Sequence, residues 1–342
     1  MKLTARIAPH IRNSISNKTV MGDAVITLLA VYVIAWFYYG MRAVALGGLS
    51  VAVCWGADSL CTLWRGRPVN RFDFSPVVTG LIIPLMLPAS VEYKVVVTAG
   101  LFAICVVKQA FGGLGSNVFN PAAGGLCFAI VCWSGKLFAY PSPFAPLAMT
   151  GQAAERLLSG PAATLSMGGV PPYDVTSMVL GLVPGPMGTT NILVVAACLL
   201  YLCFRGTVRF QQPLIFLGTA AVWAALFPRV AAEPLYSVFY ELVGTPLLFA
   251  AAFLFTDPVT TPRRGGAKAL YALISALLVM LFQWYGGYEM TIPFALLLSN
   301  ALVPVLDGCA ERYIKAKRRA KYGRRQQEGN LAAQREEIDA IQ

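Results

Sequence analysis

Three segments of this 342-residue chain combine residue types and spacings that could carry chemistry. Residues 111–125 (FGGLGSNVFNPAAGG) are rich in Gly and Asn, and Asn120 precedes a proline, a pair that favours the start of a helix. Glycines also let the backbone approach a partner closely. The segment is either a re-entrant loop that lines a cofactor or ion path or a tight turn between two helices, and its composition fits both.

Asp257 belongs to the second segment, residues 256–263 (TDPVTTPR), which also contains Thr260. The aspartate ends a strongly apolar run, where a carboxylate costs free energy unless it is paired. It either caps the backbone amides that follow or serves an ion or electron path. Four other acidic residues in or near apolar runs are either cation ligands or interface residues: Asp23, Asp58, Glu241 and Asp307.

The third segment, residues 139–189, is a long connection between apolar runs that is rich in Pro, Gly, Ser, Thr and Ala. A structureless connection of this length is usually functional or disordered. Within it, residues 159–166 (SGPAATLS) contain Thr164. Composition alone makes Thr164 an ordinary loop hydroxyl.

The sequence contains few residues that could bind a metal. The single histidine, His10, lies in the polar N-terminal tail, which argues against His-based chemistry inside a membrane, and we expect neither a metal site nor a catalytic residue. Eight cysteines occur without a CxxC pair, nearly all in apolar runs. They are either small buried hydrophobes or ligands of an iron–sulfur cluster shared with a partner chain.

The elements that position these segments are membrane helices. Hydrophobic residues make up 57% of the chain and charged residues 13%, about half the share of a soluble domain. Apolar runs near the roughly 20 residues that a bilayer requires predict an all-α polytopic protein. We expect ten spans near residues 20–40, 43–64, 74–90, 93–113, 120–138, 190–206, 213–232, 238–256, 267–287 and 289–308. The third and eighth are short and interrupted by prolines.

The basic residues predict the orientation. With both termini in the cytoplasm, 21 of the 27 Lys and Arg residues fall on the cytoplasmic side, as the positive-inside rule requires. The net charge of +11 then reflects topology and contact with anionic lipid, and we expect no nucleic-acid partner. The predicted parts are a tail (1–19), a five-helix unit (20–138), an extracytoplasmic loop (139–189), a second five-helix unit (190–308) and a basic cytoplasmic tail (309–342).

An internal repeat supports this division. A shift of 174 residues aligns residues 84–113 with 258–287 without gaps, and most of the identities are prolines and glycines that set helix breaks. Five spans separate the copies, so the second copy would lie inverted in the membrane. Inverted five-helix repeats with broken helices are used by transporters and channels.

Taken together, these segments resemble the membrane subunit family that includes RnfD and NqrB. The likeness lies in FSPVVTG (74–80), GGLG (112–115), FNPA (119–122), PGPMG (184–188), TDPVT (256–260), YGG (285–287) and LSNALVP (298–304), in order over nearly the whole chain. It is closer to RnfD, because NqrB-like chains carry a longer N-terminal extension. Membership would imply a urea-transporter-like fold of two inverted five-helix halves.

The resemblance also implies a cofactor. RnfD-like subunits carry FMN joined through its phosphate to a threonine, in a pattern close to Asp-x-x-Ser/Thr-x-Ala-Thr, and a flavin transferase makes the bond. Here Thr164 follows Ala163, although Leu158 replaces the Asp and Leu165 a frequent Pro. Thr176, preceded by Asp174, is the second candidate. The resemblance further implies a second, non-covalent flavin, riboflavin or FMN, and Asn120, Asp257 and Thr260 are candidates for a flavin or ion path.

The implied function is electron transfer in an ion-translocating ferredoxin:NAD⁺ oxidoreductase of a prokaryotic cytoplasmic membrane, coupled to Na⁺ or H⁺ transport. Its partners would be the other Rnf-type subunits: flavin-bearing G, membrane A and E, NADH-binding C and ferredoxin-accepting B. One alternative is a stand-alone channel or transporter for a small solute, which rests on fold analogy and the inverted repeat. The other is an NqrB-type quinone reductase subunit.

Overall fold

The computed structural model describes residues 17–69, 73–149, 156–231, 233–286 and 289–339, with side chains from Lys18 to Lys317. Within these residues all regular structure is helical, apart from one isolated bridge between Tyr140 and Leu158. The elements are α1 (Asn17–Tyr39), α2 (Met41–Trp64), α3 (Ser75–Leu85), α4 (Tyr93–Leu101), η1 (Phe102–Gln109), α5 (Pro121–Leu137), α6 (Pro161–Ser166), α7 (Val175–Leu180), α8 (Ile192–Phe204), α9 (Gln211–Leu226), α10 (Pro234–Gly244), α11 (Leu247–Phe249), η2 (Ala250–Leu254), α12 (Gly265–Tyr285) and α13 (Ile292–Asp339).

The helices support a polytopic membrane protein. In the described part of the chain, α1, α2, α12 and the first half of α13 are long and apolar enough to cross a bilayer. A fifth span is obtained if α10, α11 and η2 are taken as one bent helix. Helices also occupy the other expected ranges, but α3, α5, α8 and α9 have 17 residues or fewer. Length and composition therefore identify four or five spans where the apolar runs predicted ten.

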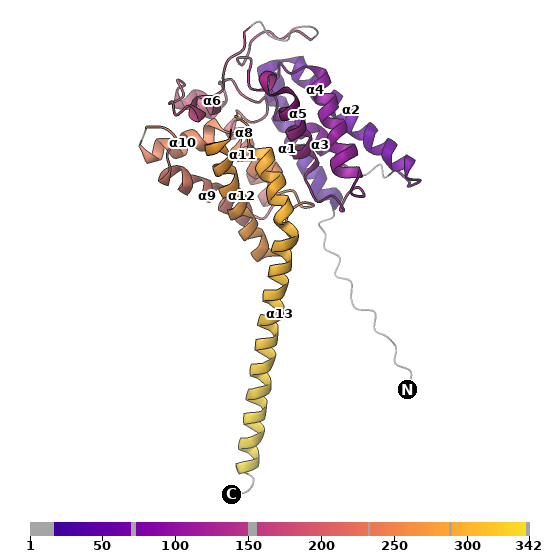
Figure 1. Cartoon of the computed structure of the whole chain (residues 1–342), viewed down its shortest axis with the longest axis vertical. Coiled ribbons are helices and arrows are strands. Elements are labelled where there is room, and N and C mark those ends of the chain that lie inside the picture. Colours follow the sequence, from indigo (N-terminus) through magenta and orange to yellow (C-terminus); the bar gives the residue numbers. More distant parts are fainter. Residues whose placement is uncertain (1–16, 70–72, 150–155, 232, 287–288, 340–342) are drawn as a thin grey trace.

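The chain forms two groups of helices that lie side by side (Figure 1). Helices α1 to α5 form one group, and the segments from α6 to α12 form the other. Contacts between the groups include α1 against α8 and α5 against α13. Helix α13 lies at this junction and then continues as a long helix away from the bundle (Figure 1).

Two apolar helices are interrupted at the positions where the prolines predicted a break. Helix α3 contains Pro84 and ends one residue later at Leu85. The α10 helix ends before Pro246, and the chain bends by 64° into α11 and η2. Proline has no N–H for the helix ladder and its ring clashes with the preceding turn, which explains both breaks. Two π-helical stretches, η1 and η2, were not predicted.

The long loop is more ordered than its composition suggested. Its described residues form two short helices, α6 and α7, so the expectation of a structureless connection was wrong there. Asp174 caps α7, because its Oδ2 accepts the Thr176 N–H at 3.1 Å. In the described part of the loop, Asp174 thus serves as a helix cap, and Leu165 packs in the interior.

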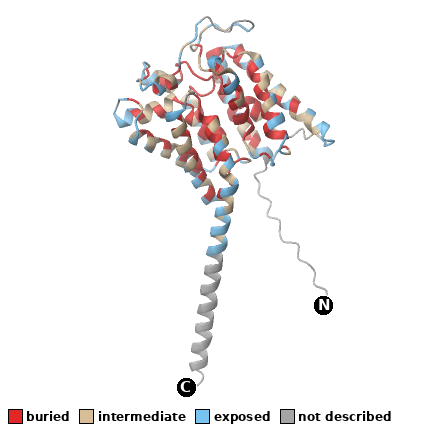
Figure 2. Cartoon of the chain, viewed as in Figure 1, coloured by how far each residue is buried: buried red, intermediate tan, exposed pale blue. Residues whose placement is uncertain are grey.

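Burial separates an apolar core from an apolar outer surface (Figure 2). Large apolar side chains such as Phe37, Leu60 and Val131 remain more than 60% exposed on helices α1, α2 and α5. Many exposed large apolar side chains fit a protein that contacts a membrane or a protein partner. Between η1 and α5, the glycine segment makes a turn with positive φ at Gly112 (116°) and Gly113 (94°), which only glycine adopts without strain.

Candidate functional site

Asn120 begins helix α5 and connects it to a segment 137 residues away. Its side-chain oxygen accepts the Ala123 N–H at 3.2 Å, and Pro121 occupies the first helical position, as the Asn-Pro pair predicted. The Asn120 Nδ2 donates to Oδ2 of Asp257 at 3.4 Å. Asn120 is 4% exposed, so both ends of its amide are used inside the protein.

Asp257 is the centre of this contact. Its Oδ2 also accepts the Thr260 hydroxyl at 2.8 Å, and its Oδ1 accepts the Val259 N–H at 3.3 Å. The three predicted residues Asn120, Asp257 and Thr260 therefore meet. The aspartate does cap the turn after η2, and this role leaves its carboxylate oriented toward α5.

A small cavity lies beside these residues. This Asn120 cavity has a volume of about 40 Å³, and its polar lining includes Ser75, Thr79, Asn117, Asn120 and Asp257. The Asn117 Oδ1 is buried and has no hydrogen-bond partner in the described part of the chain. A buried acceptor of this kind calls for a donor or a cation. The volume fits one or a few waters or an ion, whereas pockets for cofactors measure roughly 300–1,000 Å³.

Lys108 lies between the Asn120 cavity and a larger one of about 180 Å³. It is 2% exposed, and its Nζ lies 2.7 Å from the Ser75 hydroxyl, 2.9 Å from Asp58 Oδ1 and 3.5 Å from Asp73 Oδ2. The neighbouring Gln109 donates to Asp58 at 2.7 Å. The network neutralises a buried ammonium with two carboxylates.

This network was not predicted from the sequence. A lysine within an apolar span is itself a signal, because such a charge is costly unless it has partners. Its partners could not be identified, since Asp58 and Asp73 come from other elements. The other acids in question have partners as well: Asp23 binds Arg205 and Thr207, Glu241 binds Arg229, and Asp307 accepts the Arg263 N–H.

Thr164 lies on α6, the short helix that opens the second half of the long loop. Its side chain is half-buried, and its carbonyl accepts the N–H groups of Met167 and Gly169 at 3.2 and 3.0 Å. Leu165 beside it is buried, and α6 packs on α10. The arrangement fixes the backbone of Thr164 and leaves its side chain at the surface.

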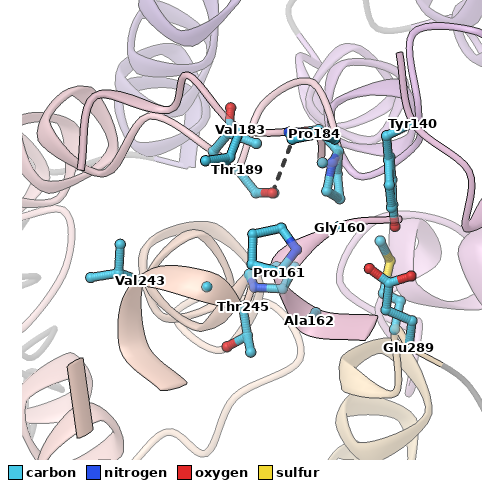
Figure 3. A pocket seen from close by; sticks show the side chains of 16 residues that line it. Tyr140, Gly160, Pro161, Ala162, Val183, Pro184, Thr189, Val243, Thr245 and Glu289 are labelled. Carbon is cyan, nitrogen blue, oxygen red and sulfur yellow. Dashed lines mark hydrogen bonds between the residues drawn. The ribbon is translucent and has the colours of Figure 1, made fainter. Parts of the chain in front are cut away.

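Glu289 lies close to this helix, between α12 and α13. Its carboxylate lies beside the Tyr140 side chain and the start of α6, where the Ala163 N–H donates to the Gly160 carbonyl at 3.2 Å. These residues border a third cavity of about 20 Å³, together with Gly160, Pro161 and Thr245 (Figure 3). Burial raises the pKa of Glu289 to about 7.

The cysteines divide by position. Cys54, Cys127 and Cys198 are buried, as expected for small hydrophobes, whereas Cys105, Cys132 and Cys309 are exposed on the helix surface. Cys61 and Cys105 bring their sulfur atoms to 3.9 Å. The described residues contain no cluster of three or more His, Cys, Asp or Glu side chains arranged for a metal.

Comparison with known proteins decides the family. A family model described as the NQR2, RnfD, RnfE family matches residues 4–315. The chain belongs to this family. The resemblance that the sequence motifs indicated is thereby confirmed.

Members of the family that match nearly the whole chain are components of ion-translocating complexes. The D subunit of the Na⁺-translocating ferredoxin:NAD⁺ oxidoreductase complex of Acetobacterium woodii is 29% identical over 328 residues, 94% of this chain and 99% of that protein. The D subunit of the ion-translocating oxidoreductase complex of Halorhodospira halophila is 28% identical over 87% of this chain and 91% of that protein. The D subunit of the proton-translocating ferredoxin:NAD⁺ oxidoreductase complex of Clostridium ljungdahlii is 26% identical over 89% and 93%.

The segments that carried the family resemblance gather at the cavities. Residues 74–80, 112–122 and 256–260 all contribute to the lining of the Asn120 cavity. Residues 184–188 contribute to the cavity beside Glu289. Much of the family's sequence signature thus forms two small polar sites.

Proposed function

We propose that this family member is the membrane electron-transfer subunit of an ion-translocating ferredoxin:NAD⁺ oxidoreductase and that it carries FMN on Thr164. The observation that carries the proposal is the match, over at least 87% of this chain, to the D subunits of three ion-translocating oxidoreductase complexes. The relatives differ in the ion that their names give, so the coupled ion here is Na⁺ or H⁺. The other Rnf-type subunits would bind ferredoxin and NAD⁺.

The surroundings of Thr164 support a covalent anchor. The side chain is partly exposed, as a modifying enzyme requires. A Cβ added to Gly169 would lie 3.2 Å from Thr164 Cγ2, so the absence of a side chain at Gly169 keeps space beside the threonine. Met167 and Val170 are 84% and 48% exposed and offer apolar surface near the anchor. Thr176 is the weaker candidate, because Asp174 is already used as a helix cap.

The bound flavin would supply the redox chemistry, and the protein would supply its position. A phosphoester on the Thr164 hydroxyl would keep the cofactor at one place on the surface. Helix α6, fixed on α10 by the buried Leu165, would hold that place. No nucleophile or general base in this chain is needed for electron transfer.

For the membrane arrangement we propose ten helices in two inverted five-helix units, as the 174-residue repeat predicts. The contacts between the units support this, because α1 pairs with its equivalent α8 and α5 pairs with its equivalent α13. Self-pairing of equivalent elements is what a twofold relation between the halves produces. Both termini would then lie in the cytoplasm and the Thr164 loop outside it.

The Asn120 cavity is proposed as part of an ion path. Its oxygen-rich lining and the unpartnered Asn117 Oδ1 suit a small hard cation or water. A volume of about 40 Å³ does not fit an isoalloxazine ring, so a second, non-covalent flavin is not assigned there. Asn120, Asp257 and Thr260 would then act in ion transfer.

The test is intact mass combined with flavin fluorescence in a denaturing gel, on protein from a host that contains the flavin transferase. The native chain should gain the mass of one FMN less one water. Thr164→Ala should lose both signals, whereas Thr164→Ser, which retains a hydroxyl, should keep at least part of them. Thr176→Ala is the matched control on α7 and should behave as the native chain.

The other outcomes separate the alternatives. An adduct that survives Thr164→Ala and disappears in Thr176→Ala would move the anchor and retain the electron-transfer function. Absence of any adduct, with a known flavoprotein substrate modified in the same cells, would refute the anchor and favour a channel or transporter.

A further inference from the structure

The surface of α2 changes from apolar to basic at the end of the helix. Leu60, Leu63 and Trp64 are each more than half exposed, and Arg65 and Arg67 come next along the chain. Exposed apolar side chains that end in a tryptophan and are followed by arginines are typical of the boundary between the hydrocarbon and the headgroups of a bilayer. This end of α2 therefore marks the depth at which phospholipid headgroups lie.

The cavity of about 180 Å³ beside Lys108 lies at this end of α2. Its lining includes Trp55, Arg65, Arg67 and Gln109, and we refer to it as the Arg65 cavity. One water needs roughly 15 Å³, so the cavity has room for a phosphate group together with several waters.

Arg65 is held at this cavity by a residue of η1 and keeps unused donors. Its Nη1 donates to Gln109 Oε1 at 3.2 Å, and its Nη2 donates to the Gln109 carbonyl. A guanidinium carries five N–H groups, so three of them have no partner among the described residues. The Gln109 side chain is buried and donates to Asp58 Oδ1 at 2.7 Å, which fixes it in turn. A guanidinium fixed in this way is pre-organised to bind a phosphate.

The positive charge of the Arg65 cavity is not cancelled. Of the five charged side chains that line it, three are basic, so the net charge is +1. Both carboxylates, Asp58 and Asp73, already lie 2.9 and 3.5 Å from the Lys108 ammonium. Neither Arg65 nor Arg67 forms an ion pair with any described residue. The cavity therefore favours an anion, because the oxygens that would bind a cation are occupied.

Apolar surface borders the cavity and indicates where the anion comes from. Trp55 lines the cavity and is 48% exposed. Ser59 also lines it, and the exposed Leu63 lies on the same face of α2, because residues four apart share a face of a helix. A phospholipid would place its phosphate at the arginines and its chains along this face. A soluble phosphate would make only the first of these contacts.

We propose that the Arg65 cavity binds the headgroup of one anionic phospholipid, with the phosphate on Arg65 and Arg67 and the chains against Trp55 and Leu63. Basic pockets beside membrane helices recognise anionic headgroups in this way. The site differs from a general attraction of basic residues to the membrane, because it holds one lipid at fixed donors. It lies on the side that the proposed orientation places in the cytoplasm, and it requires no flavin.

Native mass spectrometry of the full-length chain in detergent, titrated with lipid, tests the site. Phosphatidylglycerol should fill a first site about tenfold more tightly than phosphatidylcholine with the same acyl chains, because the latter brings its own ammonium toward the arginines. Phosphatidylglycerol should also raise the thermal unfolding midpoint more than phosphatidylcholine does, since a ligand that binds the folded state stabilises it.

Variants of the two arginines locate the site. Arg65→Gln combined with Arg67→Gln should weaken the first phosphatidylglycerol site about thirtyfold, and each single change about fivefold. Arg65→Lys retains the charge without the fork and should fall between the native chain and Arg65→Gln. The matched control, Arg263→Gln combined with Arg264→Gln, removes the same charge from the residues before α12 and should keep the native lipid preference.

Equal binding of the two lipids by the native chain overturns the proposal without any variant. A first site that survives in the double Arg65 and Arg67 variant overturns it as well, and so does an equal loss in the Arg263 and Arg264 control. Inorganic phosphate that raises the unfolding midpoint as much as phosphatidylglycerol would identify a soluble ligand and refute the lipid. If the Arg65 variants fail to fold, Arg67→Gln and the comparison of lipids on the native chain decide.

The lipid site and the flavin function can fail separately. A lipid preference in a chain that gains no covalent FMN would retain this site and refute the anchor. An FMN adduct on a chain without any lipid preference would do the reverse.

Discussion

The carboxylates of Asp257 and Glu289 lie near opposite ends of α5 and differ in the hydrogen-bond donors that surround them. Asp257 meets the start of this 17-residue helix at Asn120, and Glu289 meets the chain just past its end at Tyr140, about 25 Å away along the helix. Asp257 receives three donors, from Asn120, Thr260 and the Val259 N–H. Glu289 lies beside Tyr140, and its Oε2 is left without a partner among the described residues.

The difference shows how one fold can contain a fixed site and a responsive one. A buried carboxylate with donors on both oxygens holds its surroundings in one arrangement. A carboxylate with one unpartnered buried oxygen favours the neutral form and responds to pH. The Asn120 end is therefore the fixed site, and the Glu289 end is the one that should respond to pH.

The largest effect should follow loss of the buried cation beside the Asn120 cavity. Lys108→Met removes the ammonium that neutralises Asp58 and Asp73, and breaking a buried pair costs about 3–5 kcal/mol. We expect a clear fall in the thermal unfolding midpoint in detergent. Adding Asp58→Asn should restore part of it, because one uncompensated charge is removed.

Lys94→Met is the control, since Lys94 is 61% exposed and pairs with Glu92 at the surface. It should leave the midpoint unchanged. Equal stability of Lys108→Met and the native chain would mean that the network does not stabilise the fold, and the fixed character of this end would have to be abandoned.

A smaller effect is expected at Asp257. Asp257→Ala leaves the Asn120 amide, the Thr260 hydroxyl and the Val259 N–H without their acceptor, at a cost of about 1–3 kcal/mol. Asp257→Asn retains an oxygen acceptor and should be more stable than the alanine variant. Both should abolish ion uptake by the assembled complex in liposomes if the charge is needed for transport.

Thr261→Val provides the matched control, because Thr261 donates to the Asp257 backbone carbonyl at 2.8 Å and not to the carboxylate. It should preserve ion uptake. Full uptake by Asp257→Asn would exclude the carboxylate charge from the ion path and reduce Asp257 to a cap.

The sequence predicts a site residue when its neighbours along the chain give the signal, and it does not predict contacts between distant segments. Asn120 and Asp257 carry local signals, a helix-start pair and an acid at the end of an apolar run, and both were identified. Their contact could not be predicted, because 137 residues separate them and only the folded chain brings them together. The helix breaks at Pro84 and Pro246 were predicted, because proline acts on its own turn.

The contacts of Glu289 and Lys108 could not be predicted from sequence patterns. Glu289 follows a Tyr-Gly-Gly motif and is otherwise an acid before an apolar run, so nothing local indicates that it reaches α6. Helix α6 itself has six residues, too few for a periodic apolar pattern to appear. Only the folded loop brings Gly160, just before α6, to the carboxylate.

The smallest effect should come from Glu92, an exposed carboxylate that sharpens the contrast with Glu289. It binds Lys136 and Lys94, which hold its pKa at about 2. Stability from this group is present above its ordinary pKa of 4.5 and is lost only as the pH falls toward 2. Glu92→Gln should therefore leave the unfolding midpoint, and its change between pH 6 and 8, as in the native chain. Glu289→Gln should flatten that change, because the neutral side chain no longer binds or releases a proton. If Glu92→Gln altered the profile as much as Glu289→Gln, the pH response would come from the overall surface charge, and the difference between the two ends of α5 would not be its source.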